Sequence, residues 1–323
     1  MRVASCFALV MIAGALMACG SKGPGTTAGA GSANAAQAPK GNATAEEVAE
    51  EARGDVDCPA KVKTPRDAKA AVDDVVGVRP GLTYEEAAQL VMCSHDLMVV
   101  QADGRGFQLP AQGKDIRQGF SARFAEPRIV KSSEDYMREM SEEMMARSGN
   151  AVRQDMKPGQ SKWYVGTIGM PGQERVINAA REEWFDEGGN PTVASVEQAL
   201  LKKYGTPTRN QHVPGGSVVI TWAYDPLGRL ISETSPLYNS CHGASSPDGG
   251  ANFSPDCGIV VQANVYPLRD NPQLGQMMQV GVVDQAGGYE ALQRVEQTLQ
   301  QQDAQLKAQQ VKDAEQNANV PKL

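Results

Sequence analysis

Cysteine and histidine are the residues of this chain whose types and spacing could do chemistry. Cys93 and His95 place a thiol two positions from a base, and Cys241, His242 and Cys257 could join Cys93 around a zinc ion. Both arrangements are unusual, because a catalytic base generally comes from a distant segment and zinc ligands pair as C-x₂₋₄-C or H-x₃₋₅-H. Two disulfides are the remaining use for four thiols, and disulfides persist in an oxidising compartment.

The N-terminus predicts export to such a compartment. Arg2 precedes an apolar run from Val3 to Ala18, which is shorter than the ~20 residues of a spanning helix and typical of a secretory signal. We therefore assign residues 1–18 to a signal peptide. Cys6 leaves with it, so it is not a candidate site.

The residues LMAC, which end at Cys19, resemble the bacterial lipobox. This resemblance implies cleavage before Cys19 and attachment of acyl chains to it, so that the protein would be bound to a membrane by palmitate-type chains. Two or three chains hold a protein firmly, whereas one holds it only marginally. Gly20, which stands where inner-membrane lipoproteins carry Asp, resembles outer-membrane retention facing the periplasm. A plain signal peptide that contains a cysteine is the alternative.

Residues 19–54 are expected to form a lipidated tether, in which only the AEEVAEEAR end is suited to one or two helical turns. They contain almost no large apolar side chains, so they cannot bury enough surface to offset chain entropy. The net charge of the whole chain is −7, which argues against a nucleic-acid partner. Envelope proteins are the expected partners, and the sequence does not fix the oligomeric state.

Four cysteines allow three disulfide pairings. The simplest pairing joins Cys58 to Cys93 and Cys241 to Cys257, and it keeps each bridge within one half of the chain. The second bridge would close a loop rich in Gly, Ser, Pro and Asp. Closing a loop of ~15 residues contributes about 3 kcal/mol in the chain-entropy model.

Residues 55–160 are predicted to form a first α+β unit. Thr83 and Glu86 make a capping box at the start of a helix, and LMVVQADGRGFQL is expected to be a hairpin that turns at Asp103-Gly104. GFSARFAEPRIV continues as a strand, and SSEDYMREMSEEMMARSG is a helix that ends at Gly149.

Residues 161–289 are predicted to form a second, related unit. KWYVGTIG and ERVINAAREEWF are neighbouring strands across Pro171-Gly172, followed by a helix capped by Asn190 and ended by Gly205. Three β-branched runs follow, SVVITWAYD, GIVVQANVYP and MMQVGVVDQ. Short connections predict an antiparallel sheet with helices packed on it, an α+β fold.

Residues 290–323 are predicted to form a polar helical tail. Leu292, Leu299 and Leu306 recur every seven residues, but Gln302 and Gln309 interrupt the apolar stripe. We expect the first turns to dock and the rest to extend into solvent; a short coiled coil is the alternative.

Met137, Met140 and Met144 are spaced to share one helical face. Flexible thioethers can line an adaptable binding surface, so these residues are a candidate partner surface. A stripe that faces the protein core is the alternative interpretation.

Two phrases of the sequence, VGVRPGLTYEEAAQLV and PTVASVEQALLKKYGTP, resemble motifs of secreted proteobacterial proteins. They are similar to the helix and turn of the small outer-membrane lipoprotein module SmpA/OmlA and of β-lactamase-inhibitor-like folds. The matching residues are Gly77, Gly81, Thr83, Glu86 and Ala87, then Thr192, Leu200, Lys203, Tyr204, Gly205 and Pro207. The resemblance implies a non-enzymatic module that binds proteins or stabilises assemblies.

Catalytic templates are missing from the sequence, which has no HExxH, G-x-S-x-G or G-x-x-x-x-G-K-[ST] motif. Adjacent acids such as Glu182-Glu183 are typical of a solvated surface, and Asp248, Asn252 and Asp256 lack calcium-loop spacing. We therefore expect no enzyme activity, metal or cofactor. The function expected is binding or assembly by a lipid-anchored envelope protein; the alternatives are an inhibitor of a periplasmic hydrolase and a cell-wall hydrolase that uses acidic residues.

Overall fold

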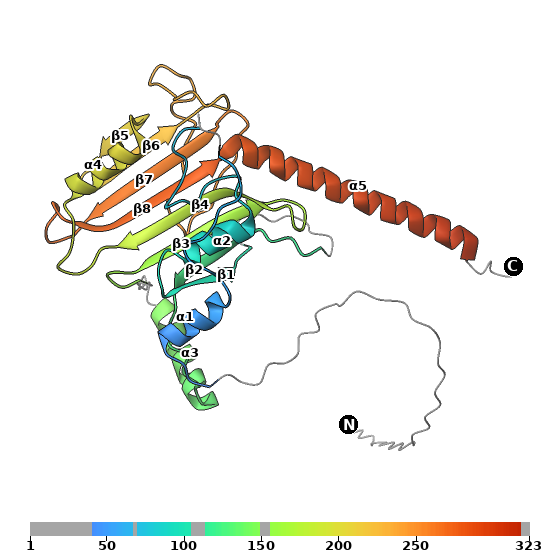
Figure 1. Ribbon diagram of the computed structural model, residues 1–323, viewed down its shortest axis with the longest axis horizontal. Coiled ribbons are helices and arrows are strands. Elements are labelled where there is room, and N and C mark those ends of the chain that lie inside the picture. The colour runs from blue at the N-terminus through green and yellow to red at the C-terminus, as the bar shows by residue number, and fades with distance from the viewer. Residues whose placement is uncertain (1–40, 67–69, 105–113, 149–155, 318–323) are drawn as a thin grey trace, which may run out of the picture. The chain divides into compact units, whose positions relative to one another are not determined.

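The protein folds around one antiparallel sheet. In the computed structural model, the described residues are 41–66, 70–104, 114–148 and 156–317. The strands are β1 (Met98–Ala102), β2 (Gly119–Phe124), β3 (Ser161–Ile168), β4 (Arg175–Trp184), β5 (Arg209–His212), β6 (Val218–Ala223), β7 (Ile259–Pro267) and β8 (Gly275–Asp284). Their order is β1-β2-β3-β4-β8-β7-β6-β5, with every neighbouring pair antiparallel (Figure 1). The predicted α+β class is confirmed.

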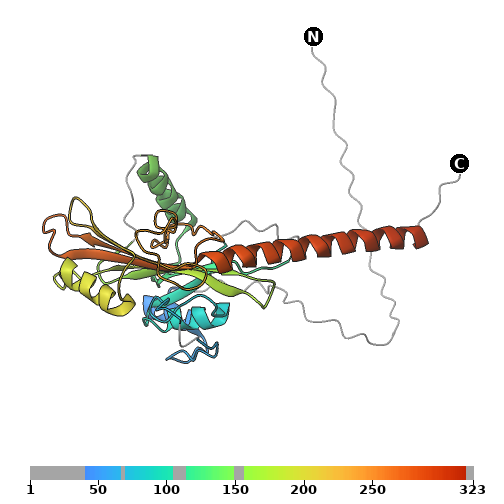
Figure 2. The same ribbon diagram turned by 90° about the horizontal axis from the view of Figure 1, so that it is seen from above.

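Five helices lie among the described residues. They are α1 (Ala45–Arg53), α2 (Tyr84–Met92), α3 (Ser133–Ser148), α4 (Val193–Tyr204) and α5 (Gln285–Asn317). Figure 2 shows α2 and α4 on one face of the sheet, with the loop between β6 and β7 on the other face. Residues on successive positions of a strand point to opposite faces, so each central strand supplies side chains to both layers.

One core cluster spans both predicted units. Trp163 from β3 and Trp222 from β6 are almost fully buried in it, together with Leu200 of α4 and Val91 of α2. Burying an indole removes about 200 Å² from water and contributes about 5 kcal/mol. Because β2 also pairs with β3, the two halves expected from the sequence share one sheet and one core.

The opposite face is packed by the Cys241–Cys257 loop and by the start of α5. Cys241 and Cys257 are buried against Val260 and Val283, while Val295 and Leu299 of α5 join a separate cluster with Ile168 and Ile177. Leu306 is 63% exposed. The first turns of α5 thus dock on the sheet, as the fading apolar stripe predicted, and the later turns face solvent.

Helix α2 begins at the predicted capping box, which also fastens the preceding segment. Thr83 accepts from the Glu86 amide at 3.1 Å, and Glu86 accepts in return from the Thr83 amide at 3.1 Å. The Glu86 carboxylate also accepts from the amides of Lys63 at 2.7 Å and Thr64 at 2.8 Å. Burial acts to raise the pKa of Glu86, but the Thr64 hydroxyl and these amides outweigh burial and lower the pKa from 4.5 to about 2.

We expect Glu86→Gln to lower the free energy of unfolding at pH 7 by about 1–2 kcal/mol. The contribution of the carboxylate is fully present above its unfolded pKa of 4.5 and is lost as the pH falls towards 2. The variant should therefore lose less stability than the native chain between pH 5 and pH 2 in urea titrations. Glu126→Gln, at an exposed loop position, is the control and should stay within about 0.5 kcal/mol; equal acid sensitivity of Glu86→Gln and the native chain would contradict the assignment.

Some local predictions were wrong. Helix α4 is capped by Thr192, whose side chain accepts from the Ser195 amide, and not by Asn190, which donates to the Gly275 carbonyl at 2.8 Å. The second strand of the predicted hairpin falls largely in residues 105–113, outside the described residues, so the hairpin stays a prediction; among the described residues β1 pairs with β2. Strand β5 was missed because its sequence, RNQH, has no β-branched or aromatic residue.

Both ends of the folded region differ from expectation. Helix α1 lies within the segment predicted to be a tether, and its Ala49 is almost fully buried. Helix α5 starts at Gln285, before the predicted residue 290, and includes Gly287 and Gly288. A Cβ at Gly288 would lie 2.4 Å from the Phe253 ring, so the glycine lets this loop residue approach the helix.

Candidate functional site

An apolar pocket opens between α4 and the sheet. It has a volume of about 380 Å³, within the range of small-ligand sites. Helix α4 supplies one wall, β4 and β8 supply the floor, and the turn at residues 75–78 supplies part of the rim. Representative lining residues are Val76, Arg181, Ala199, Leu200, Lys203 and Val280. We call this hollow the α4 pocket.

Helix α4 is positioned by its own sequence pattern. Val196, Leu200 and Tyr204 recur every four residues and are buried against the sheet. Thr192 caps the first turn and Gly205, at φ 79°, ends the helix in a conformation that L side chains rarely adopt. Residues next to the buried stripe, such as Ser195 and Ala199, are exposed and line the α4 pocket.

Arg181 is one of two cations that line the pocket. It projects from β4 on the helix-covered face, where its guanidinium lies 5.7 Å from the centre of the Trp163 ring and binds Glu183 at 2.6 Å. The Arg181 Nε is buried and has no hydrogen-bond partner in the part of the chain that the structure describes. A guanidinium has five N–H donors, so Arg181 retains donors for a bound group.

Lys203 is the other cation, and it links α4 to the turn at residues 75–78. Its ammonium binds the Asp74 carboxylate at 2.9 Å, and the same carboxylate accepts from the Gly77 amide at 2.9 Å. Tyr204 donates its hydroxyl to the Asp74 carbonyl at 2.9 Å. Asp74 thus holds the turn against the last turn of α4.

The charge state of this junction follows from its partners. Burial acts to raise the pKa of Asp74, but the Gly77 amide and the Lys203 ammonium outweigh burial and hold the pKa below its usual value. Burial, together with the nearby Asp74, raises the pKa of Tyr204. The pocket rim therefore carries an ionised Asp74 paired with Lys203 and a neutral Tyr204 at ordinary pH.

Val76 is the strained residue of the rim. Val75 and Val78 exchange both backbone hydrogen bonds across a two-residue turn, in which Val76 has φ 47° and Gly77 has φ 85°. A β-branched residue rarely adopts a positive φ, and such strain costs about 1–3 kcal/mol. The Val76 side chain is nevertheless 52% exposed beside the pocket. Burial of the Val76 side chain therefore does not offset the backbone strain. This favours a role for the side chain in contacting a bound group.

The predicted cysteine pairs are present as disulfides. Cys58 is bonded to Cys93 and Cys241 to Cys257, and neither pair provides a free thiol for nucleophilic chemistry. His95 stacks on Phe124 at 4.1 Å between ring centres. Within residues 41–66, 70–104, 114–148 and 156–317, no group of three or more His, Cys, Asp or Glu side chains could hold a metal.

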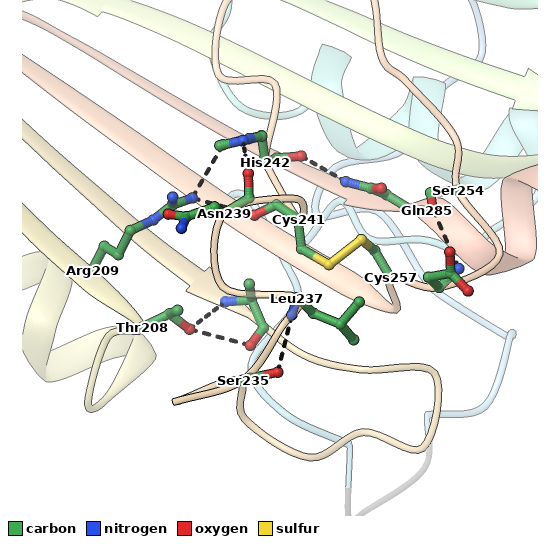
Figure 3. The surroundings of a disulfide bond; sticks show 12 residues. Thr208, Arg209, Ser235, Leu237, Asn239, Cys241, His242, Ser254, Cys257 and Gln285 are labelled. Carbon is green, nitrogen blue, oxygen red and sulfur yellow. Dashed lines mark hydrogen bonds between the residues drawn. A yellow bond between two sulfur atoms is a disulfide. The ribbon is translucent and has the colours of Figure 1, made fainter. Parts of the chain in front are cut away.

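Figure 3 shows how the second disulfide is fixed to its surroundings. The His242 carbonyl accepts from Gln285 at 2.6 Å, and His242 Nε2 lies 2.7 Å from the Asn239 carbonyl. Arg209 of β5 reaches the Cys241 carbonyl at 3.3 Å. The loop is therefore joined to β5 and to the start of α5, and its histidine is part of these structural contacts.

Among the described residues, the adjacent acids bind other side chains rather than each other. Asp73 and Asp74 both bind Arg66, and Asp74 also binds Lys203. On β4, Glu182 and Glu183 point to opposite faces: Glu183 binds Arg181 on the helix side, and the buried Glu182 accepts from Trp184 and Gln279, each at 2.8 Å. In the loop between Cys241 and Cys257, which lacks calcium-ligand spacing, Asp248 binds Lys162.

The predicted partner surface, where the structure describes it, lies apart from the α4 pocket. Met137 and Met140 of α3 are 58% and 41% exposed, which differs from the alternative of a core-facing stripe. The side chain of Met144 lies outside the described residues, as does Cys19. Among the described residues, no helix is long and apolar enough to cross a bilayer.

Sequence reasoning named Lys203 and Tyr204 only through a resemblance, and it missed Val76 and Arg181 as site residues. Arg181 could have been recognised from the sequence, since it places a charge among the apolar residues of β4 on the side that faces the helices. Val76 gave none, because VVGV is also typical of a strand.

Comparison with protein-family models, with curated proteins and with solved structures gave no match to this chain. The resemblance of the two sequence phrases to the lipoprotein module stays a prediction. Inferences about function therefore depend on the residues and geometry described above.

Proposed function

We propose that this chain is a lipid-anchored protein of the bacterial cell envelope that binds a partner without chemical turnover. In this proposal Cys19 carries the acyl chains, and the α4 pocket receives an apolar group of the partner. The α4 pocket is the observation that carries the proposal, because it combines an apolar lining with two cations and an exposed, strained rim residue. The lipobox and the two disulfides support an envelope location.

The chemistry of the pocket specifies the kind of group that would fit. Its walls are mainly aliphatic, so they favour an apolar body. Arg181 and Lys203 each have an intramolecular acid partner, but a guanidinium and an ammonium have more donors than one carboxylate uses. The preferred occupant is therefore an apolar group that carries an acceptor, such as a carboxylate at the end of an aliphatic or aromatic chain.

A fluorescent anion tests this proposal. 8-Anilino-1-naphthalenesulfonate has an aromatic body and a sulfonate, and we expect saturable binding to the native chain. Ala199→Phe places a ring in the pocket from an exposed helical position, and it should weaken binding about tenfold. Ala194→Phe is the matched control, because Ala194 is exposed on the same helix and does not line the pocket.

Two further variants separate the parts of the site. Lys203→Gln should weaken the anion but leave neutral N-phenyl-1-naphthylamine unchanged. Val76→Asn should relieve backbone strain, since Asn tolerates positive φ, and so raise stability by about 1 kcal/mol while it weakens both probes. Probe binding that Ala199→Phe and Ala194→Phe alter equally would exclude the α4 pocket as the site.

A further inference from the structure

A second exposed apolar surface lies where the N-terminal segment enters the folded region. It consists of Ile129, Val130, Tyr136, Met137 and Met140, with exposed fractions of 64, 60, 61, 58 and 41%. Met140 lies three residues after Met137 and four after Tyr136, so it neighbours both of them on the surface of α3. We call these five residues the α3 patch.

The N-terminal segment is fastened directly beside this patch. Ala43 and Arg128 exchange backbone hydrogen bonds at 2.9 Å in both directions, and Arg128 Nε donates to the Gly41 carbonyl at 3.0 Å. The Val130 amide donates to the Asn42 side chain at 2.7 Å. Residues 41–43 are thus hydrogen-bonded to the same short segment, residues 128–130, that contributes Ile129 and Val130 to the patch.

This position limits how far the patch can lie from an anchor at Cys19. About 20 residues separate Cys19 from Gly41, and a stretch of this length spans at most about 70 Å. A membrane that holds Cys19 would therefore hold the α3 patch within reach of its surface. Confinement of this kind raises the effective concentration of a surface for its partner, so a few apolar side chains are sufficient for docking.

The charges around the patch indicate what kind of docking it supports. Arg128 binds Glu51 at 2.9 Å, Lys131 binds Glu139, and Arg138 binds Asp135 at 2.8 Å. Each of these cations is balanced by an acid, so the described residues around the patch show no excess of the positive charge that attracts anionic lipid. Docking would depend on apolar burial at the headgroup boundary, for which Tyr and Met side chains are suited.

We infer that the α3 patch is a membrane-docking surface, which rests against the bilayer that holds the acylated Cys19 and orients the sheet relative to it. The inference depends on the lipid anchor of the proposed function, but it is independent of the α4 pocket. It predicts two membrane contacts, the acyl chains on Cys19 and the α3 patch. Binding through the α3 patch should remain measurable when the acyl chains are removed.

The test uses the chain without residues 1–18 and with Cys19→Ser, so that no acyl chain contributes. This protein is mixed with vesicles of phosphatidylethanolamine and phosphatidylglycerol at a ratio of 3:1, and the bound fraction is measured by flotation. We expect weak, saturable binding that the double variant Met137→Gln, Met140→Gln reduces about tenfold. Raising the salt from 0.1 to 0.5 M should change binding less than about twofold, because apolar contacts are not screened.

A matched control comes from α5. The double variant Leu306→Gln, Val311→Gln removes two side chains with exposed fractions of 63 and 58% from a different element, and it should bind vesicles like the parent. Absence of vesicle binding by the Cys19→Ser chain would overturn the inference. A concentration-dependent dimer that is lost in the Met137→Gln, Met140→Gln variant would overturn it too, since the occupant would then be a second copy.

Palmitate labelling of the native chain distinguishes failure of the anchor from failure of the docking surface. If the native chain is not labelled but its Cys19→Ser form still binds vesicles, the lipid anchor is rejected and the docking surface is supported. If the native chain is labelled but its Cys19→Ser form does not bind vesicles, the lipid anchor is supported and the docking surface is rejected.

Discussion

Replacing Cys241 and Cys257 together by alanine is expected to lower the free energy of unfolding by about 3 kcal/mol. The bridge spans a sequence separation of 16 residues, and its loop is composed largely of Gly, Ser, Pro and Asp. Few apolar side chains are available to hold the loop by burial once the covalent link is lost. Urea unfolding of the oxidised native chain and the double variant measures the difference.

The Cys58–Cys93 bridge is the internal comparison. Its sequence separation is 35 residues, so the chain-entropy model assigns it a slightly larger contribution, about 4 kcal/mol. The two bridges differ in location, however. Cys241 and Cys257 are buried against residues of β7 and β8. We expect only the Cys241, Cys257 variant to increase hydrogen exchange in β8, beneath the loop. A loss below about 1 kcal/mol for this variant would mean that burial of the loop alone holds it in place.

Local sequence rules predicted the elements that are determined by near neighbours. The Thr83 and Glu86 capping box starts α2 as expected, and the Pro171-Gly172 turn joins β3 to β4. Gly205 ends α4 because this position requires a positive φ. In each case the deciding interaction lies within a few residues of the signal.

The arrangement of the strands was not predictable in the same way. Strand β4 pairs with β8, so that Ala180 lies opposite Gly281, and this pairing joins the two halves of the sheet. Nothing in the local pattern of RVINAAREEW specifies GQMMQVGVVD as its neighbour, because the two strands are far apart in the sequence. The α4 pocket could not be predicted from the sequence for the same reason. Its residues Arg181, Lys203 and Val76 come together only after the sheet has formed and α4 has packed on it.

Helix α1 illustrates a different reason for error. Its sequence, AEEVAEEAR, was expected to form one or two helical turns within the tether, and its packing on the folded region was not expected because it has few large apolar residues. In the structure, Ala49 is buried, Arg53 bonds to the Asp96 carbonyl, and Glu51 binds Arg128. A short polar helix can thus be retained by a capping box and ion pairs to a body that is already folded, which composition alone does not reveal.

Gly281→Ala is expected to destabilise the fold by about 3 kcal/mol or more, a large effect for one methyl group. A Cβ at this position of β8 would lie 1.9 Å from the Ala244 carbonyl oxygen and 3.0 Å from the Ser245 Cα. These are backbone atoms of the disulfide loop, so they cannot move aside as a side chain would. The loop must either lift from the sheet or distort β8, and thermal unfolding should detect the cost.

Gly250→Ala is the matched control, because Gly250 lies in the same loop and a Cβ there meets nothing within 4 Å. Its effect should stay within about 0.5 kcal/mol.

Combining Gly281→Ala with the Cys241, Cys257 double replacement tests whether both changes act on the same contact between the loop and β8. If the disulfide holds the loop against Gly281, freeing the loop lets it retreat from the new methyl group, and the combined loss should fall short of the sum by about 1 kcal/mol or more. Additive losses would instead mean that the loop stays on β8 without its covalent bridge.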